Sequence, residues 1–82
     1  MDFVDLTGEE CPMFFVRVML RMHETPAGGG AGFIVSDGPQ LRDVRRSAEA
    51  DGHRVEPVGR DGGRNFILIW KDGMHGRAGP EA

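Results

Sequence analysis

The residue with the clearest capacity for chemistry is Cys11, the only cysteine among 82 residues. It follows Gly8-Glu9-Glu10, precedes Pro12, and stands at the start of a segment with helical periodicity. The first N–H groups of a helix have no intrahelical partner and carry partial positive charge. A cysteine sulfur beside them is stabilised as a thiolate, which is the nucleophilic form. Pro12 suits the first helical position, because its missing N–H would be unbonded there in any case.

The alternative is that Cys11 is a small buried hydrophobic residue, as lone cysteines often are. The polar sequence Thr7-Gly8-Glu9-Glu10 argues against burial and indicates a surface turn. Glu9 and Glu10 also act against the helix end, since nearby carboxylates raise the pKa of a thiol. The sequence leaves the balance of these two effects open.

Length and composition restrict the class of protein. Eighty-two residues make one small domain, near the size at which a single core is only marginally stabilising. One cysteine allows no disulfide within the chain, and a free thiol fits a reducing cytoplasm. Met1-Asp2-Phe3 does not begin a signal peptide, and no apolar run approaches the roughly 20 residues of a membrane span. We therefore expect a cytoplasmic protein without membrane contact.

The first half of the chain reads as strand, helix and strand. Residues 3–6 form a short strand, and a helix follows from Pro12 to residue 23 or 24. Its spacing predicts a buried face made of Phe15, Val18, Met19 and Met22. Residues 32–35 form a second strand, whose continuous apolar run predicts burial on both faces.

The second half reads as helix, strand and strand. A turn at residues 36–39 starts a helix with Leu41, Val44 and Ala48 on its apolar stripe. Residues 53–58 form an edge strand, because Pro57 cannot donate a ladder hydrogen bond. A hairpin loop at 59–64 leads to the strongest strand, 66–70, which we expect to be central.

This element order predicts an α/β (α+β) two-layer sandwich. The order is β-α-β-α-β-β, with a mixed four-stranded sheet and both helices on one face. We expect residues 1–72 to form the domain and 73–82, which are rich in glycine and charge without periodicity, to be a flexible tail.

Five arginines form the other candidate site. Arg17 and Arg21 lie one turn apart on the first helix, and Arg42, Arg45 and Arg46 lie off the apolar stripe of the second. They make either a docking patch for an acidic partner or an ordinary solvated surface. His23, His53 and His75 have no metal-ligand spacing with each other or with Cys11, so we expect no metal site. No pattern indicates a cofactor.

The chain resembles the TusA/SirA-type sulfur carriers over residues 3–72. The resemblance depends on the order and spacing of several short motifs, which are Asp5-Leu6-Thr7-Gly8, Cys11-Pro12, Val35-Ser36-Asp37-Gly38-Pro39, Arg42-Asp43-Val44, Gly52-His53 and Ile67-Leu68-Ile69-Trp70-Lys71. It implies the two-layer fold described above and a cysteine that carries sulfane sulfur as a persulfide. Cys11 and Pro12 carry over as the motif, with Gly8 in its usual place upstream, supporting the helix N-terminus.

The resemblance also implies the partners. A cysteine desulfurase or rhodanese-like donor supplies the sulfur, and an acceptor protein uses it in tRNA thiolation, cofactor assembly or sulfur metabolism. Such a chain is a persulfide sulfurtransferase or carrier that acts with partner enzymes, and we expect a monomer. A second cysteine would resolve a persulfide into a disulfide, so the single cysteine suits a carrier.

One position departs from the family pattern. The family commonly has a second proline two residues after the first, where this chain has Phe14. Because the first helical N–H groups are unpaired, we expect a proline there to remove no hydrogen bond. We expect Phe14, with Met13, to offer an apolar contact surface for partners.

Two other functions are weighed against the carrier. The departure at Phe14 favours a non-catalytic regulatory or protein-interaction module on the same fold. A small RNA-binding domain is the third reading. The net charge of −3 and the lack of an aromatic and basic strand face argue against direct nucleic-acid binding.

Overall fold

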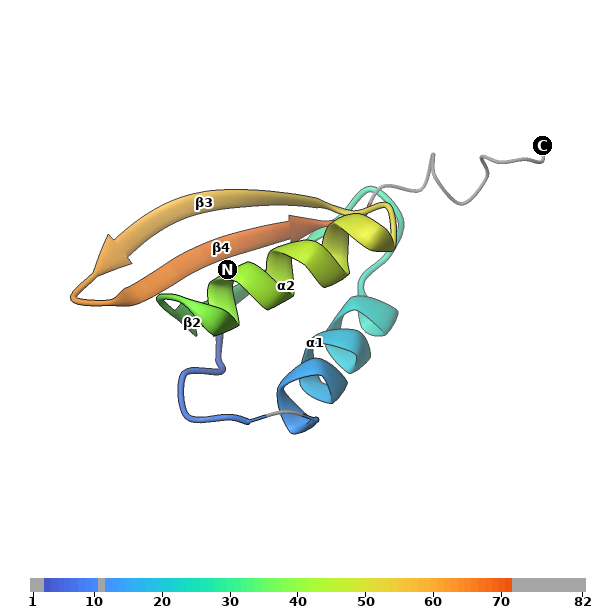
Figure 1. The fold of residues 1–82 in the computed structure, drawn as a ribbon. Helices are drawn as coiled ribbons and strands as arrows, with labels where there is room; N and C mark the ends of the chain where they lie inside the picture. Colours follow the sequence, from blue (N-terminus) through green and yellow to red (C-terminus); the bar gives the residue numbers. More distant parts are fainter. Residues whose placement is uncertain (1–2, 11, 72–82) are drawn as a thin grey trace.

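The computed structural model describes residues 3–10 and 12–71 as a two-layer α+β sandwich (Figure 1). The elements follow the predicted order: β1 (Phe3–Asp5), α1 (Met13–Glu24), β2 (Gly30–Ser36), α2 (Pro39–Ala50), β3 (Arg54–Asp61) and β4 (Arg64–Trp70). The four strands form one sheet in the order β1-β2-β4-β3. β1 is parallel to β2, and the other neighbouring pairs are antiparallel. Both helices cover the same face, and β4 is central and β3 an edge strand, as the sequence predicts.

The core lies between the sheet and the two helices. Alternate residues of β2 and β4 face the helices, because side chains alternate between the faces of a strand. The buried cluster comprises Leu6, Phe14, Val18, Met22, Ala31, Phe33, Val35, Val44, Ala48, Ile67 and Ile69. On α2, the predicted stripe is confirmed, with Val44 and Ala48 buried and Leu41 packed against the cluster.

β2 is buried on both faces, although helices cover only one. On the open face, two glycines make room for aromatic rings that lie across the strand. A Cβ on Gly32 would stand 2.7 Å from the ring of Phe3, and a Cβ on Gly30 would stand 2.8 Å from the ring of Trp70. Such distances are too short for real carbon contacts, so both positions require glycine unless the rings move. The rings cover the open face of β2 where a third layer is missing.

The hairpin between β3 and β4 is tighter than predicted. β3 continues to Asp61 and leaves a two-residue turn at Gly62 and Gly63. Both turn residues have positive φ, 57° and 87°, which is the backbone that a type I′ hairpin turn requires. The expected loop at 59–64 is therefore wrong. A bulge between Pro57 and Gly59 shifts the pairing register, and this irregularity hides the strand from its sequence pattern.

The buried face of α1 differs in phase from the predicted one. Phe14, Val18 and Met22 are buried, while Met19 is 63% exposed and Phe15 is half-buried. The expectation that Phe14 offers a surface contact is therefore wrong, since only 3% of the residue is exposed. Periodicity did not distinguish the two phases, because α1 carries apolar residues on most of its circumference.

The expected tail at residues 73–82 lies outside the described residues. Among residues 3–10 and 12–71, no helix is long and apolar enough to cross a membrane.

Replacing Phe14 by alanine should lower the free energy of unfolding by roughly 3–5 kcal/mol, the usual cost of deleting a buried phenylalanine ring. Phe15→Ala is the matched control, because it removes the same atoms from a half-buried neighbour. Its loss should be clearly smaller. Urea unfolding monitored by circular dichroism measures both losses. If Phe14→Ala does not fold, Phe14→Leu and Phe15→Leu should show the same ranking, and a larger loss at Phe15 would contradict the core assignment.

Candidate functional site

The expected nucleophile, Cys11, lies outside the described residues, but both residues bonded to it, Glu10 and Pro12, lie within them. Pro12 is the N-cap of α1 with φ −90° and ψ −7°, so the helix begins one residue later than predicted. The N–H of Phe14 donates to the carbonyl of Glu10 at 2.9 Å, and that of Val16 donates to Pro12 at 3.1 Å. The residues on both sides of Cys11 are thus hydrogen-bonded to the first turns of α1.

The parallel pairing of β1 and β2 decides where this segment lies. The carboxyl ends of two parallel strands meet at the same edge of a sheet, and there the loops that follow them converge. The pairing extends past β1, because the N–H of Leu6 donates to the carbonyl of Ile34 at 2.8 Å. Residues 7–10 therefore run beside the start of α2.

Gln40, the second residue of α2, fastens this segment with its side-chain amide. Its Nε2 donates to the carbonyls of Leu6 at 2.8 Å and Glu9 at 2.9 Å, and lies 3.4 Å from the carbonyl of Thr7. Its Oε1 accepts from the N–H of Ser36 at 2.8 Å. We did not single out Gln40 in the sequence. A signal was present, since it stands four residues before Val44 on the core-facing stripe of α2, where a polar side chain is out of place.

Charged contacts hold the two ends of the same segment. Arg17 of α1 donates to the carboxylate of Glu9 at 2.8 Å, so the negative charge of Glu9 is offset by α1 itself. At the other end, the carboxylate of Asp5 accepts from the hydroxyl of Thr7 at 2.6 Å and from its N–H at 3.0 Å. The Thr7 hydroxyl, then its N–H, and then Arg64 hold the pKa of Asp5 below its ordinary value.

Gly8 has no conformational or packing reason to be glycine. It is exposed, it does not have the positive φ that favours glycine, and an added Cβ would meet nothing within 4 Å. The expected role of Gly8 in supporting the helix N-terminus stays a prediction.

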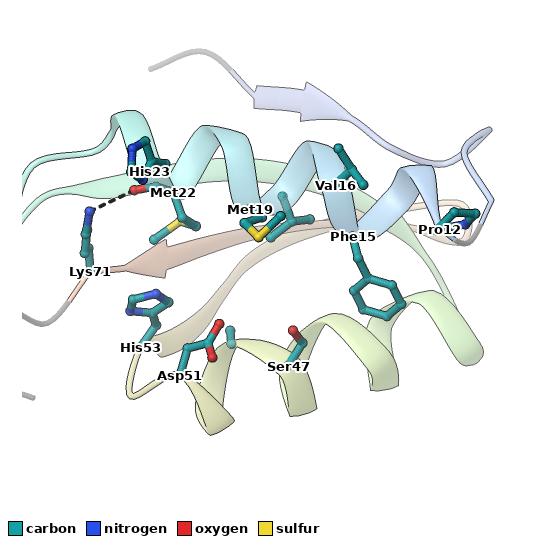
Figure 2. Close-up of a pocket in the computed structure, with 12 residues that line it drawn as sticks. Pro12, Phe15, Val16, Met19, Met22, His23, Ser47, Asp51, His53 and Lys71 are labelled. Carbon is teal, nitrogen blue, oxygen red and sulfur yellow. Dashed lines mark hydrogen bonds between the residues drawn. The ribbon is translucent and has the colours of Figure 1, made fainter. Parts of the chain in front are cut away.

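A groove of about 430 Å³ runs between the helices from Pro12 to His53 and Lys71 (Figure 2). Phe15, Met19 and Met22 give it apolar walls. At the far end, the ammonium of Lys71 donates to the carbonyl of Met22 at 3.1 Å. The α1 surface outside the core is also apolar, since Met13 is 52% and Leu20 57% exposed. An apolar surface of this kind on α1 is suited to protein contact.

The five arginines do not form one face. The residues of α1 that line the groove toward α2 include Phe15 and Met19, and each is followed two residues later by an arginine, Arg17 or Arg21. Two residues turn a helix by about 200°, so these arginines lie on the side of α1 away from α2. The arginines of α1 and α2 therefore do not make a single shared patch, which was one of the two alternatives.

The arginines of α2 form a surface of their own. Arg42 contacts Asp43 at 3.4 Å. Arg45 and Arg46 are exposed, and no carboxylate of residues 3–10 or 12–71 lies within 4.0 Å of their guanidinium groups. On α1, by contrast, Arg17 contacts Glu9, and Arg21 lies 3.9 Å from Glu24.

Comparison with known proteins identifies the family. The model of the family described as sulfurtransferase TusA matches residues 2–71. The chain belongs to this TusA family. A putative sulfur carrier protein from Archaeoglobus fulgidus is 33% identical over 70 residues, which is 85% of this chain and 80% of that protein. The crystal structure of a SirA-like protein from Desulfitobacterium hafniense has the same fold, with a TM-score of 0.73 at 23% identity, covering 88% of this chain and 99% of the other.

The structure corrects our reading of the TusA family's second proline. We expected proline at position 14 to remove no hydrogen bond. The N–H of Phe14 is in fact bonded to Glu10, and proline would lose that bond because it has no N–H. In this member, Phe14 joins the backbone of Glu10 to the core.

The open face of the sheet contradicts another expectation. Phe3 and Phe66 meet edge to face at 5.5 Å, and the guanidinium groups of Arg54 and Arg64 lie 5.8 Å and 5.7 Å from the rings of Trp70 and Phe66. An aromatic and basic strand face is therefore present, and the argument from its absence is wrong. Carboxylates lie beside these groups: the indole N–H of Trp70 donates to Glu56, and Arg64 contacts Asp5.

The histidines lie apart from the segment before Cys11. His23 and His53 line the groove at its far end, and His75 lies outside the described residues. Within the described part of the chain, no group of three or more His, Cys, Asp and Glu side chains is placed to hold a metal ion.

The lowered pKa of Asp5 makes stability depend on pH in a defined direction. Between the folded pKa and the ordinary value of 3.8, the unfolded chain binds more protons, so stability falls as pH falls through this range. Asp37 acts in the same direction, because Asn65 and then Arg60 lower its pKa. Asp5→Asn and Thr7→Val should each lose less stability than wild type between pH 6 and pH 3, as measured by urea unfolding. Equal losses of stability in wild type, Asp5→Asn and Thr7→Val over this pH range would show that the contact of Asp5 with Thr7 does not cause the pH dependence.

Proposed function

We propose that this chain is a sulfur carrier that holds sulfane sulfur as a persulfide on Cys11. The observation that carries the proposal is the TusA family match over residues 2–71, a span that contains Cys11-Pro12. The relative named as a putative sulfur carrier supports the same role. The hydrogen bonds that join Glu10 and Pro12 to the start of α1 support it further, since a helix start stabilises a thiolate.

The proposed transfer is a thiol exchange without net oxidation. The thiolate of Cys11 attacks the terminal sulfur of a donor persulfide, and a new S–S bond forms as the donor's S–S bond breaks. The donor cysteine leaves as a thiolate and takes a proton from solvent, replacing the proton that Cys11 released on ionisation. An acceptor thiolate then attacks the terminal sulfur on Cys11 in the same way. The rate depends on thiolate fraction, nucleophilicity and access.

The donor and the acceptor would dock on the helical face. A cysteine desulfurase or rhodanese-like protein is the proposed donor, and tRNA thiolation, cofactor assembly or sulfur metabolism the proposed destination. Met13, two residues after Cys11 in the chain, and Leu20, further along α1, supply exposed apolar area. Arg45 and Arg46 supply positive charge on α2 for an acidic partner. We propose that the carrier is cytoplasmic and monomeric.

The second candidate is an interaction module that has kept the fold and lost the transfer. Phe14 in place of the family's second proline favours it. Its burial gives the substitution a packing role, which is compatible with either function.

Intact-protein mass spectrometry separates the two functions. Wild type and Cys11→Ala are incubated with a cysteine desulfurase and cysteine, and separately with a rhodanese and thiosulfate. A carrier should gain the mass of one sulfur atom on wild type alone, and a thiol reductant should remove it. No sulfur on wild type with either donor, from a protein whose thiol still reacts with iodoacetamide, would favour the interaction module.

Reversing the charge of Arg45 and Arg46 should weaken binding to an acidic partner about tenfold or more at low salt, because close charge complementarity contributes strongly to association. Arg45→Glu with Arg46→Glu is compared with Arg54→Glu and Arg60→Glu, which make the same net change on β3. Isothermal titration calorimetry against the desulfurase that loads the chain measures both. Equal affinities for the two double variants would remove α2 from the docking surface.

A further inference from the structure

We propose that Gln40 is a positioning residue, which fixes the segment before Cys11 relative to the start of α2 and thereby sets the reactivity of the thiol. The proposal rests on the proposed sulfur-carrier function. Gln40 reaches across more than 30 positions of sequence to residues 6–9, so the contact exists only in the folded chain.

The chemistry of this contact requires a primary amide. The side chain donates to two backbone carbonyls, of Leu6 and Glu9, and accepts from the N–H of Ser36. Glutamine has two N–H donors and one carbonyl oxygen on the same group, which allows both at once. Glutamate donates nothing when ionised, lysine accepts nothing, and asparagine is one methylene shorter. In the reverse orientation, the amide oxygen would face the backbone carbonyls and the NH₂ group would face the N–H of Ser36. The hydrogen bonds therefore also fix the orientation of the amide.

The Gln40 side chain links β2 to the segment before Cys11. One end is the ladder of β2, because Ser36 is the last residue of that strand. The other is the carbonyl of Glu9, two residues before Cys11 in the chain. Beyond Cys11, the N–H of Phe14 holds the carbonyl of Glu10 from the side of α1. Gln40 thus holds the segment before Cys11 to the sheet, and the N–H of Phe14 holds it to α1.

Loss of the amide would release residues 7–10 from the sheet while Arg17 still held the side chain of Glu9. The carbonyl of Glu9 and the N–H of Ser36 would then need water as partner, while the carbonyl of Leu6 would keep only the N–H of Glu9 at 3.0 Å. This weakens the local structure without removing any core side chain. A thiolate held less firmly at the helix start loses part of its electrostatic stabilisation and its alignment for attack.

Gln40→Met tests the proposal, because methionine has a similar length and carries no charge that would itself shift the thiol pKa. Thr25→Val is the matched control. It deletes a part-buried side-chain hydrogen bond of 2.8 Å, to the carbonyl of Arg21 at the opposite end of α1. Both variants are compared with wild type for thermal stability, amide hydrogen exchange over residues 6–10, and iodoacetamide reaction rate against pH. Since Cys11 is the only cysteine, the alkylation rate reports on it alone.

Gln40→Met should exchange faster over residues 6–10 and should raise the pH midpoint of alkylation by about half a unit, the size of a lost helix-end interaction. Its initial rate of sulfur loading from a cysteine desulfurase should fall about tenfold. Thr25→Val should lose stability but keep the wild-type exchange rate over residues 6–10, alkylation midpoint and sulfur-loading rate. If Gln40→Met does not fold, Gln40→Asn should give the same pattern, because its amide is too short to join both sides.

Two results would overturn the positioning role. One is a wild-type alkylation profile and exchange rate in Gln40→Met, and the other is an equal change in Thr25→Val, which would tie the effect to stability alone. The alkylation profile and the exchange need no donor protein, so they test Gln40 even if wild type accepts no sulfur. If the Gln40→Met variant loads sulfur as fast as wild type, the carrier function stands, but Gln40 plays no part in it.

Discussion

The parallel pairing of β1 with β2 is the constraint on which the site depends. Because the two strands run in the same direction, both end at one edge of the sheet, and the segments that follow them meet there. One segment leads to Cys11 and α1, and the other leads to α2. An antiparallel β1 would send its following segment to the opposite edge, away from Gln40. The three residues of β1 thus set the surroundings of the expected nucleophile.

Around this edge, the segment before Cys11 is held more firmly by polar contacts than by packing. Only Leu6 enters the core, whereas Thr7 and Glu9 are fastened by hydrogen bonds and an ion pair. A carrier needs its reactive residue accessible to two partners in turn, and a buried apolar anchor at the residue itself would prevent that. Polar fastening keeps the backbone in place and leaves the surface open. The contact of Arg17 with Glu9 also offsets one of the two negative charges that the sequence places before the thiol.

The open face of the sheet shows how a small domain completes its core with few layers. Two glycines on β2 leave room for the rings of Phe3 and Trp70 against the strand, and Ile34 on the same strand is only 7% exposed without a helix above it. Aromatic rings with Arg54 and Arg64 beside them make this face aromatic and basic, which the alternation of residues along each strand did not reveal. Phe66 and Trp70 come from β4 and Phe3 from the distant β1, and the sheet order β1-β2-β4-β3 places all three rings on or beside β2.

The sequence by itself determined the order of elements, the central place of β4 and the Cys11-Pro12 motif at the start of a helix, because these depend on local periodicity, turn residues and one distinctive residue pair. The helix phase that buries Phe14 and not Met19 was decided by tertiary packing, since α1 is apolar on most of its surface and periodicity allows either phase. The separation of the arginines into two surfaces was decided in the same way. The link from Gln40 to residues 6–9 was decided only by the tertiary structure. A polar residue on the apolar stripe of α2 marks Gln40 in the sequence, but these partners lie more than 30 residues away, and a hydrogen bond between distant residues leaves no period in the sequence.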